Sequence, residues 1–280
     1  MPLYFAILAQ GENVTNESMQ RQWNNPQFLQ FWKGLEPGMV TLMAPLFEAL
    51  DVKSGERILD VGCGGGLTTL EAAAATGPAG HVTGADISDD LLELARSRAA
   101  QSGLSNVDFA KVDAQSDDLP GGPFDAAMSR LGVMFFADFV AAFANIRRHI
   151  KPGGRLAFVC LQDTTANPWF GGHVVAKYAP PRPPSRFPAP SPFALGAEPL
   201  TREFLSEAGF RDIRFTDFTD IDISPVPEVP AAVSLLAGMG VQPDALAKAA
   251  EELRAIDLQF LKDGHLVVDR KHWVVTARNP

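Results

Sequence analysis

The sequence predicts an α/β protein built on a doubly wound, mostly parallel, seven-stranded sheet with additional helical cover segments. From residue 56 onward, short apolar runs alternate with longer amphipathic stretches, which is the pattern of βαβ units around a parallel sheet. The first of these runs leads directly into a glycine-rich stretch, GCGGG at 62–66. In addition, 46% of the 280 residues are hydrophobic, which is enough apolar material for a core between sheet and helices.

The elements of this sheet are expected in regular order along the chain. The five strands are expected at 57–62, 81–86, 107–112, 124–129 and 155–161. The helices between them are expected at 66–76, 89–102 and 137–150. Each helix is followed by residues that stop helices, namely Gly77, Gly103 and the KPGG stretch at 151–154. This alternation of strands and helices, with a stop signal after each helix, predicts a continuous parallel sheet.

The rest of the chain is expected to form the end of the sheet and its cover. Eight of the 22 prolines lie between 180 and 199, a stretch that can form neither a helix nor an inner strand. A helix at 201–208, a strand at 210–218, helices at 229–240 and 244–262 and a last strand at 272–279 follow. The predicted domains are an N-terminal helical cover (1–50), a core (51–218 and 263–280), a proline-rich lid loop (162–199) and a helical cover insertion (219–262).

Charge and cysteine content narrow the class of partner. The net charge of −9, without a cluster of basic residues, argues against nucleic-acid binding and favours a small-molecule partner. The two cysteines are too few for a disulfide framework, so a cytoplasmic protein is expected. The apolar stretch near the N-terminus is too short to span a bilayer, and no membrane association is expected. The sequence does not decide the oligomeric state, or whether residues 1–18 belong to the native start.

The glycine stretch indicates a loop that brings the main chain close to a ligand. Glycines between a buried strand and a helix allow this approach and expose free N–H groups of the helix. In a dinucleotide fingerprint a third glycine would stand at Leu67. The chain has instead the form DxGxGxG, from Asp60 to Gly66, which argues against a dinucleotide.

This motif and its register resemble the class I S-adenosylmethionine-dependent methyltransferases, in particular bacterial small-molecule enzymes of the ubiquinone and menaquinone C-methyltransferase group. Asp86 ends the second strand, KVDAQSDDLP closes the third, FDAAMSRLGVMFFAD covers the fourth, and RRHIKPGGRLAF leads into the fifth. The resemblance implies S-adenosylmethionine as cofactor and S-adenosylhomocysteine as product. The cofactor-binding residues that it implies are Asp60, Gly62, Cys63, Gly64, Asp86, Ile87, Asp113, Ala114 and Ser129.

Some of these residues also have purely structural interpretations. Asp60 could bind amides of its own loop, and Asp86 could support the start of the next helix. Cys63 has no histidine near it in sequence, so a small residue in a tight turn is the simpler interpretation.

The reaction implied is in-line methyl transfer to a small, apolar or aromatic acceptor, on oxygen, carbon or nitrogen, without a metal. If the acceptor must lose a proton, His173 and Asp163, which follow the fifth strand, are the general-base candidates. His81, His265 and His272 are expected away from the strand ends. Two alternatives remain: a protein that binds S-adenosylmethionine without methylating, and an NAD-dependent oxidoreductase.

Overall fold

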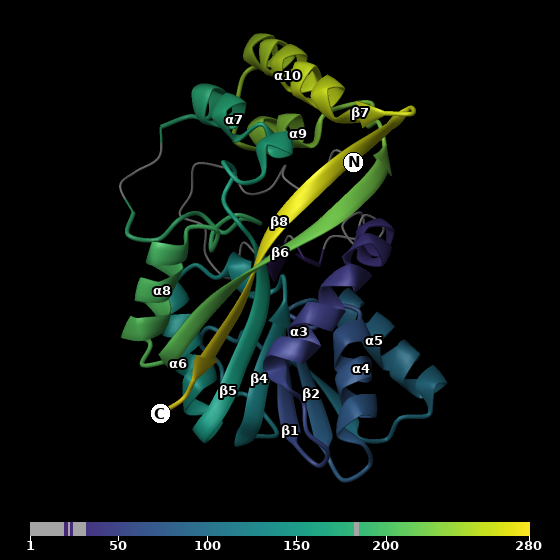
Figure 1. Ribbon diagram of the computed structural model, residues 1–280, viewed down its shortest axis with the longest axis vertical. Coiled ribbons are helices and arrows are strands. Elements are labelled where there is room, and N and C mark those ends of the chain that lie inside the picture. The colour runs from purple at the N-terminus through teal and green to yellow at the C-terminus, as the bar shows by residue number, and fades with distance from the viewer. Residues whose placement is uncertain (1–19, 22, 25–31, 182–184) are drawn as a thin grey trace.

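The computed structural model describes residues 20–21, 23–24, 32–181 and 185–280. Figure 1 shows the sheet flanked by helices on both sides and a separate group of helices beyond one end of the sheet. The question of the native start at residues 1–18 lies outside the described residues. Within the described ranges no helix is both long and apolar enough to cross a membrane.

The sheet has the strand order β3-β2-β1-β4-β5-β8-β6, and β7 pairs with β8. Its strands are β1 (Arg57–Val61), β2 (His81–Asp86), β3 (Val107–Lys111), β4 (Phe124–Arg130), β5 (Ile150–Leu161), β6 (Arg211–Pro225), β7 (Leu261–Lys262) and β8 (His265–Arg278). The first five are parallel, while β8 runs antiparallel to β5 and β6. The predicted fold class is confirmed, and the eighth strand is the two-residue β7.

Both faces of the parallel sheet are buried because neighbouring residues on each strand pack into different cores. In β1, Ile58 packs with helix α3 (Met43–Leu50) and α4 (Leu67–Thr76), whereas Leu59 packs with α6 (Phe139–Arg148) and α8 (Glu198–Glu207). Helix α5 (Asp89–Ser102) lies beside α4 (Figure 1). Burial on both faces explains why these strands appear in the sequence as nearly continuous apolar runs.

The cap beyond the sheet has its own apolar core, formed by α7 (Gly172–Tyr178), α9 (Ala231–Gly238) and α10 (Pro243–Asp257). Two short 3-10 helices join it, at Pro168–Phe170 and Leu258–Phe260. The predicted lid loop at 162–199 is therefore interrupted by helical structure. Pro168 suits the first position of a helix and starts the first of these segments.

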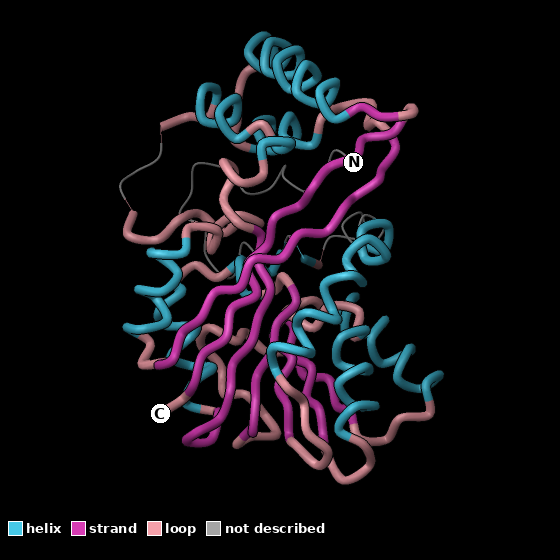
Figure 2. Tube along the Cα trace, viewed as in Figure 1, coloured by secondary structure: helices cyan, strands magenta, loops and turns pink. Residues whose placement is uncertain are grey.

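A long antiparallel pair of strands, β6 and β8, connects the sheet to the cap, as Figure 2 shows, and residues 226–264 of the cap lie between the two strands in sequence. Residues 219–225 were expected in a helical insertion, but they continue β6, and β8 begins at His265 instead of 272. The cause is an inverted alternation: Ile221 and Ile223 are 63% and 66% exposed, whereas Asp220 is buried. Because acidic residues lie on the inner face and isoleucines on the outer face, the sequence lacks the usual pattern of buried apolar and exposed polar residues that predicts a strand.

Candidate cofactor and acceptor site

A cavity of about 970 Å³ lies between the sheet, the N-terminal cover and the cap. The last residues of β1, β2, β4 and β5 all line it: Val61, Asp86, Arg130 and Leu161. It therefore opens at the carboxyl ends of the parallel strands, where open α/β sheets bind ligands. Its volume lies near the upper end of the usual range for small-molecule sites, ~300–1,000 Å³, which leaves room for two ligands.

The glycine loop after β1 forms one wall of this cavity. Gly62 has a φ of 67°, and a Cβ atom there would lie 2.7 Å from the Cα of Gly132. Gly64 has a φ of 52°, and a Cβ there would lie 2.8 Å from the Trp32 ring. Both positions thus require glycine for backbone conformation and for space. The loop presents backbone to the cavity because no side chain fits.

Asp86 links the end of β2 to the glycine loop. Its Oδ2 accepts a hydrogen bond from the Gly64 N–H at 2.8 Å, and its Oδ1 accepts one from the Ser88 N–H at 2.9 Å. Burial raises the pKa of this carboxyl. Each oxygen retains a second acceptor position, and Asp86 lines the cavity. The carboxylate is thus placed to accept hydrogen bonds from a diol.

The predicted residues after β2 and β3 also lie at the cavity. Ile87, Asp113 and Ala114 line it together with Cys63. Asp113 shapes its own turn, because its Oδ1 accepts a hydrogen bond from the Gln115 N–H at 2.9 Å. The Ile87 side chain provides an apolar surface on which a ring can pack. The Asp113 carboxylate provides a polar contact for the same ring.

Two of the predicted residues, Asp60 and Ser129, do not line the cavity. Asp60 is buried behind the loop, where its Oδ2 accepts a hydrogen bond from the Thr69 hydroxyl at 2.7 Å and its Oδ1 has no partner. Burial raises its pKa to about 6. The Ser129 hydroxyl donates to the Val61 oxygen at 2.7 Å and accepts from the Gly132 N–H at 3.2 Å. Both side chains hold the loop from behind.

Cys63 lines the cavity but is not suited to act as a nucleophile. Burial, with Asp86 and Asp60 nearby, raises the pKa of its thiol well above its usual value. Since the thiolate is the reactive form, this cysteine stays unreactive.

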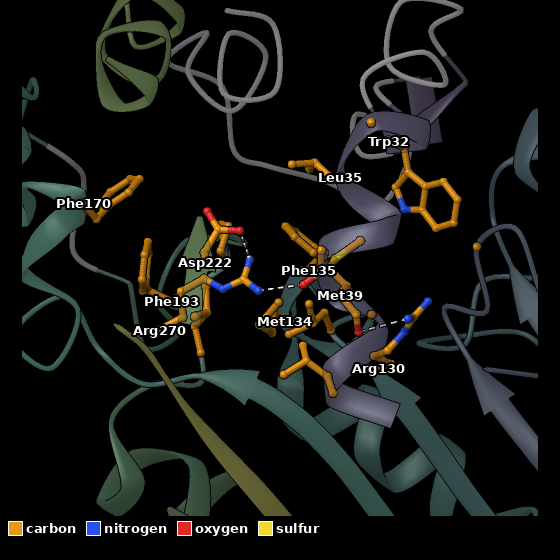
Figure 3. Close-up of a pocket in the computed structure, with 18 of the residues that line it drawn as sticks. Trp32, Leu35, Met39, Arg130, Met134, Phe135, Phe170, Phe193, Asp222 and Arg270 are labelled. Atoms are coloured by element: carbon orange, nitrogen blue, oxygen red, sulfur yellow. Dashed lines mark hydrogen bonds and ion pairs between the residues drawn. The ribbon is translucent and has the colours of Figure 1, made fainter. Parts of the chain in front are cut away.

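Arg130 is a cationic residue at the cavity wall that lies below Trp32 and Met39 in Figure 3. Its Nη1 donates to the Met39 oxygen at 3.1 Å, and within the described residues no carboxylate forms an ion pair with it. Burial lowers the pKa of its guanidinium. Its remaining N–H groups are available to an anionic ligand group beside the glycine loop.

The N-terminal cover is fastened to the same loop. Glu36 is buried and pairs with Arg98 of α5 through two hydrogen bonds, 2.6 and 2.9 Å long. Arg98 also donates to the Gly65 oxygen at 2.8 Å. Trp23, Trp32 and Met39 of this cover line the cavity, whereas Phe28 and Phe31 lie outside the described residues.

The far end of the cavity is mostly apolar and faces the cap. Figure 3 shows Phe170 and Phe193 on this side, opposite Trp32. The rings of Phe170 and Phe193 lie 4.6 Å apart between centroids, and Trp169, Phe260 and 225–230 complete the lining. Asp222, Arg270 and His272 contribute polar groups from the paired strands β6 and β8. This end suits a largely apolar molecule with a polar substituent.

The two predicted base candidates lie away from this cavity. His173 is exposed on α7, and Asp163 bonds within its own turn, where Thr165 hydrogen bonds lower its pKa. Neither residue lines the cavity. His272, which was expected away from the strand ends, does line it. The spacing of Leu266, Val268, Arg270 and His272 on one face of β8 is the signal that could have revealed this.

A mostly parallel sheet that ends in two antiparallel strands, with a DxGxGxG loop at its carboxyl edge, defines a Rossmann-like α/β fold. Residues 58–154 match a family model described as a methyltransferase domain.

Two relatives and one solved structure are similar to this chain. Aklanonic acid methyltransferase of Streptomyces sp. (strain C5) is 39% identical over 105 residues, which are 38% of this chain and 48% of the relative. Nocamycin O-methyltransferase of Saccharothrix syringae is 29% identical over 226 residues, which are 74% of this chain and 80% of the relative. A S-adenosylmethionine-dependent methyltransferase structure from Aquifex aeolicus superimposes with a TM-score of 0.51 and 15% identity, covering 94% of this chain and 98% of that one.

The first of these matches thus spans about half the length of the relative. The match to a methyltransferase domain covers residues 58–154, and over this region the fold and the loop resemble those of class I S-adenosylmethionine-dependent methyltransferases.

Proposed function

We propose that this chain transfers a methyl group from S-adenosylmethionine to a small, mostly apolar organic acceptor. The observation that carries the proposal is the continuity of one cavity of about 970 Å³ from the glycine loop and Asp86 to the aromatic cap. Cofactor and acceptor would share it, with the cofactor at the loop and the acceptor below the cap. The cytoplasmic setting expected for this reaction is supported by two buried, free cysteines.

The residues present fit this cofactor. No side chain fits at Gly62 or Gly64, so a ligand at these positions would lie directly against backbone. Asp86 would accept hydrogen bonds from the ribose hydroxyls, Ile87 would pack on the adenine, and Asp113 with Ala114 would meet its edge. Arg130 would pair with the carboxylate at the amino-acid end. Asp60, Cys63 and Ser129 would act through the shape of the loop.

When bound, the cofactor supplies a methyl carbon that is already activated for displacement. The duties left to the protein are alignment of the acceptor and exclusion of water. Trp32 and the Glu36–Arg98 pair keep the cover closed over the loop, and Phe170 and Phe193 form an apolar wall around the acceptor. His173 and Asp163 remain base candidates only if the cap moves, because neither lines the cavity.

Methyl-labelled S-adenosylmethionine with a panel of phenols, amines and prenyl compounds tests the proposal. Label in an organic product supports methyl transfer. Binding of S-adenosylhomocysteine without transfer to any panel member would favour a protein that does not methylate. Binding of NAD(H) instead would favour an oxidoreductase.

A further inference from the structure

The inward face of the β6–β8 strand pair carries a linked polar cluster in a mostly apolar part of the cavity. Asp220 and Arg270 stand opposite each other across the two strands, and Phe218 stands opposite His272. Arg270, Asp222 and His272 all line the cavity. Because Leu161 at the end of β5 pairs with His272, the cluster lies three strand spacings from β1, roughly 14 Å across the sheet edge.

Arg270 is already neutralised within this cluster. Its Nε donates to Asp220 Oδ1 at 3.2 Å, its Nη2 donates to Asp220 Oδ2 and, at 2.7 Å, to the Gly38 oxygen, and its Nη1 lies 3.4 Å from Asp222 Oδ1. Two carboxylates therefore face one guanidinium. A third anion is unfavourable here, so the cluster selects for a neutral polar group on the acceptor.

The surroundings of His272 fix the position of its ring proton. Nδ1 lies 3.1 Å from the Arg270 oxygen and 3.4 Å from Asp220 Oδ1, and both of these atoms are hydrogen-bond acceptors. In the neutral ring Nδ1 therefore carries the hydrogen, and Nε2 has the free lone pair.

Nε2 is the ring nitrogen for which the described residues provide no partner. In the described part of the chain, the buried side-chain atoms that lack a hydrogen-bond partner are Asp60 Oδ1 and Asn145 Oδ1. Nε2 of His272 is not among these closed-off atoms, although no described residue forms a hydrogen bond with it. His272 lines the cavity. Its lone pair is thus available to a ligand.

We propose that His272 accepts a hydrogen bond from a hydroxyl group of an aromatic or enolic acceptor and removes its proton, with Asp220 as the positioning residue. This deepens the proposed function and rests on it. The proton moves from the acceptor oxygen to Nε2, and the electron pair of the O–H bond stays on the oxygen. That oxygen would then form its bond to the methyl carbon while the bond from this carbon to the cofactor sulfur breaks, which leaves S-adenosylhomocysteine, and the ring would release its proton to solvent. The site thereby favours O-methylation.

The test compares 1-naphthol with naphthalene, two rings that differ by one hydroxyl group. In the presence of S-adenosylhomocysteine the wild-type protein should bind 1-naphthol about three- to tenfold more tightly than naphthalene. His272→Phe should remove this preference and keep naphthalene binding. His265→Phe, at an exposed histidine of the same strand, is the matched control and should keep the preference.

Nitrogen NMR of the wild-type protein provides a readout that needs no variant. We expect protonated Nδ1 and unprotonated Nε2 near neutral pH, with an Nε2 shift on addition of 1-naphthol but not of naphthalene. Asp220→Asn should weaken the preference for that tautomer.

Equal binding of the two rings by the wild-type protein, a preference that persists in His272→Phe, or a proton on Nε2 would overturn the inference. Failure of this inference can be distinguished from failure of the proposed function. If the proposed function is wrong, the protein does not bind S-adenosylhomocysteine. The comparison of 1-naphthol with naphthalene is also made without that ligand, so it tests His272 separately.

Discussion

The Asp86 carboxylate accepts a hydrogen bond from the backbone N–H of Gly64 at 2.8 Å, so the same side chain that faces the cavity also holds the glycine loop. This contact couples loop conformation to the end of β2. A ligand that binds Asp86 thus meets a loop that is already in place, which reduces the entropy cost of binding.

Asp86→Asn should reduce the affinity for S-adenosylhomocysteine at least about tenfold, because the amide loses charge-assisted acceptance at one of its two positions. Calorimetric titration measures this. Asp89→Asn, at an exposed carboxylate that pairs with Lys111, is the matched control and should leave affinity unchanged. Unchanged affinity in a folded Asp86→Asn protein would contradict the role of Asp86.

Gly62→Ala should destabilise the fold much more than Gly103→Ala. Both glycines have similar positive φ, 67° and 72°, so each alanine meets a conformational cost of about 1–2 kcal/mol. Only at Gly62 would the new Cβ also collide with backbone, at 2.7 Å from Gly132, whereas Gly103 has open space. Denaturant unfolding of the two variants checks this, and equal losses of stability would be inconsistent with the packed loop.

Arg98→Ala should lower the free energy of unfolding by about 3 kcal/mol, because it leaves the Glu36 carboxylate buried without its partner. It should also weaken S-adenosylhomocysteine binding, since Arg98 holds the Gly65 oxygen. Arg96→Ala, on the same helix but with a single exposed hydrogen bond to Phe109, should cost under about 1 kcal/mol. If both variants changed the affinity for S-adenosylhomocysteine by similar amounts, the proposal that Arg98 holds the N-terminal cover against the glycine loop would be wrong.

Stability should fall in mild acid because of His272. Burial lowers its pKa from 6.5 to about 4, while Asp220 acts against this change and Arg270 adds to it. The folded state thus favours the neutral ring. Its contribution is complete above pH 6.5 and is lost as pH falls through about 4, with a total of about 3 kcal/mol. Thermal unfolding between these pH values should show a smaller loss of stability for His272→Gln than for the wild-type protein. Identical pH profiles of the two proteins would exclude His272 as the source of the loss.

The core of the fold was predictable from sequence because its strands are buried on both faces. Ile58 and Leu59 lie on opposite sides of the sheet and are both fully buried, so the run is apolar throughout. The loop was predictable for a related reason, since only glycine satisfies the φ of Gly62 and its close approach to Gly132. In both cases local chemistry determines the structure.

The cover was harder to predict because long-range pairing determines it. Asp220 and Arg270 are 50 positions apart, and their pairing stabilises polar residues on the inner face of the β6–β8 strand pair. The sequence does not show this partner, so Asp220 looks like an exposed residue. For that reason the continuation of the strand and the position of His272 were not predicted. For the same reason Asp60 and Ser129 were assigned to the ligand, although their side chains turn toward Thr69 and Val61.

The most direct test of the central claim is a calorimetric titration of the wild-type chain with S-adenosylhomocysteine, run beside a titration with NAD(H). The account predicts saturable binding of S-adenosylhomocysteine, with one molecule per chain, and no binding of NAD(H). Binding of NAD(H) alone, or of neither ligand, would contradict it.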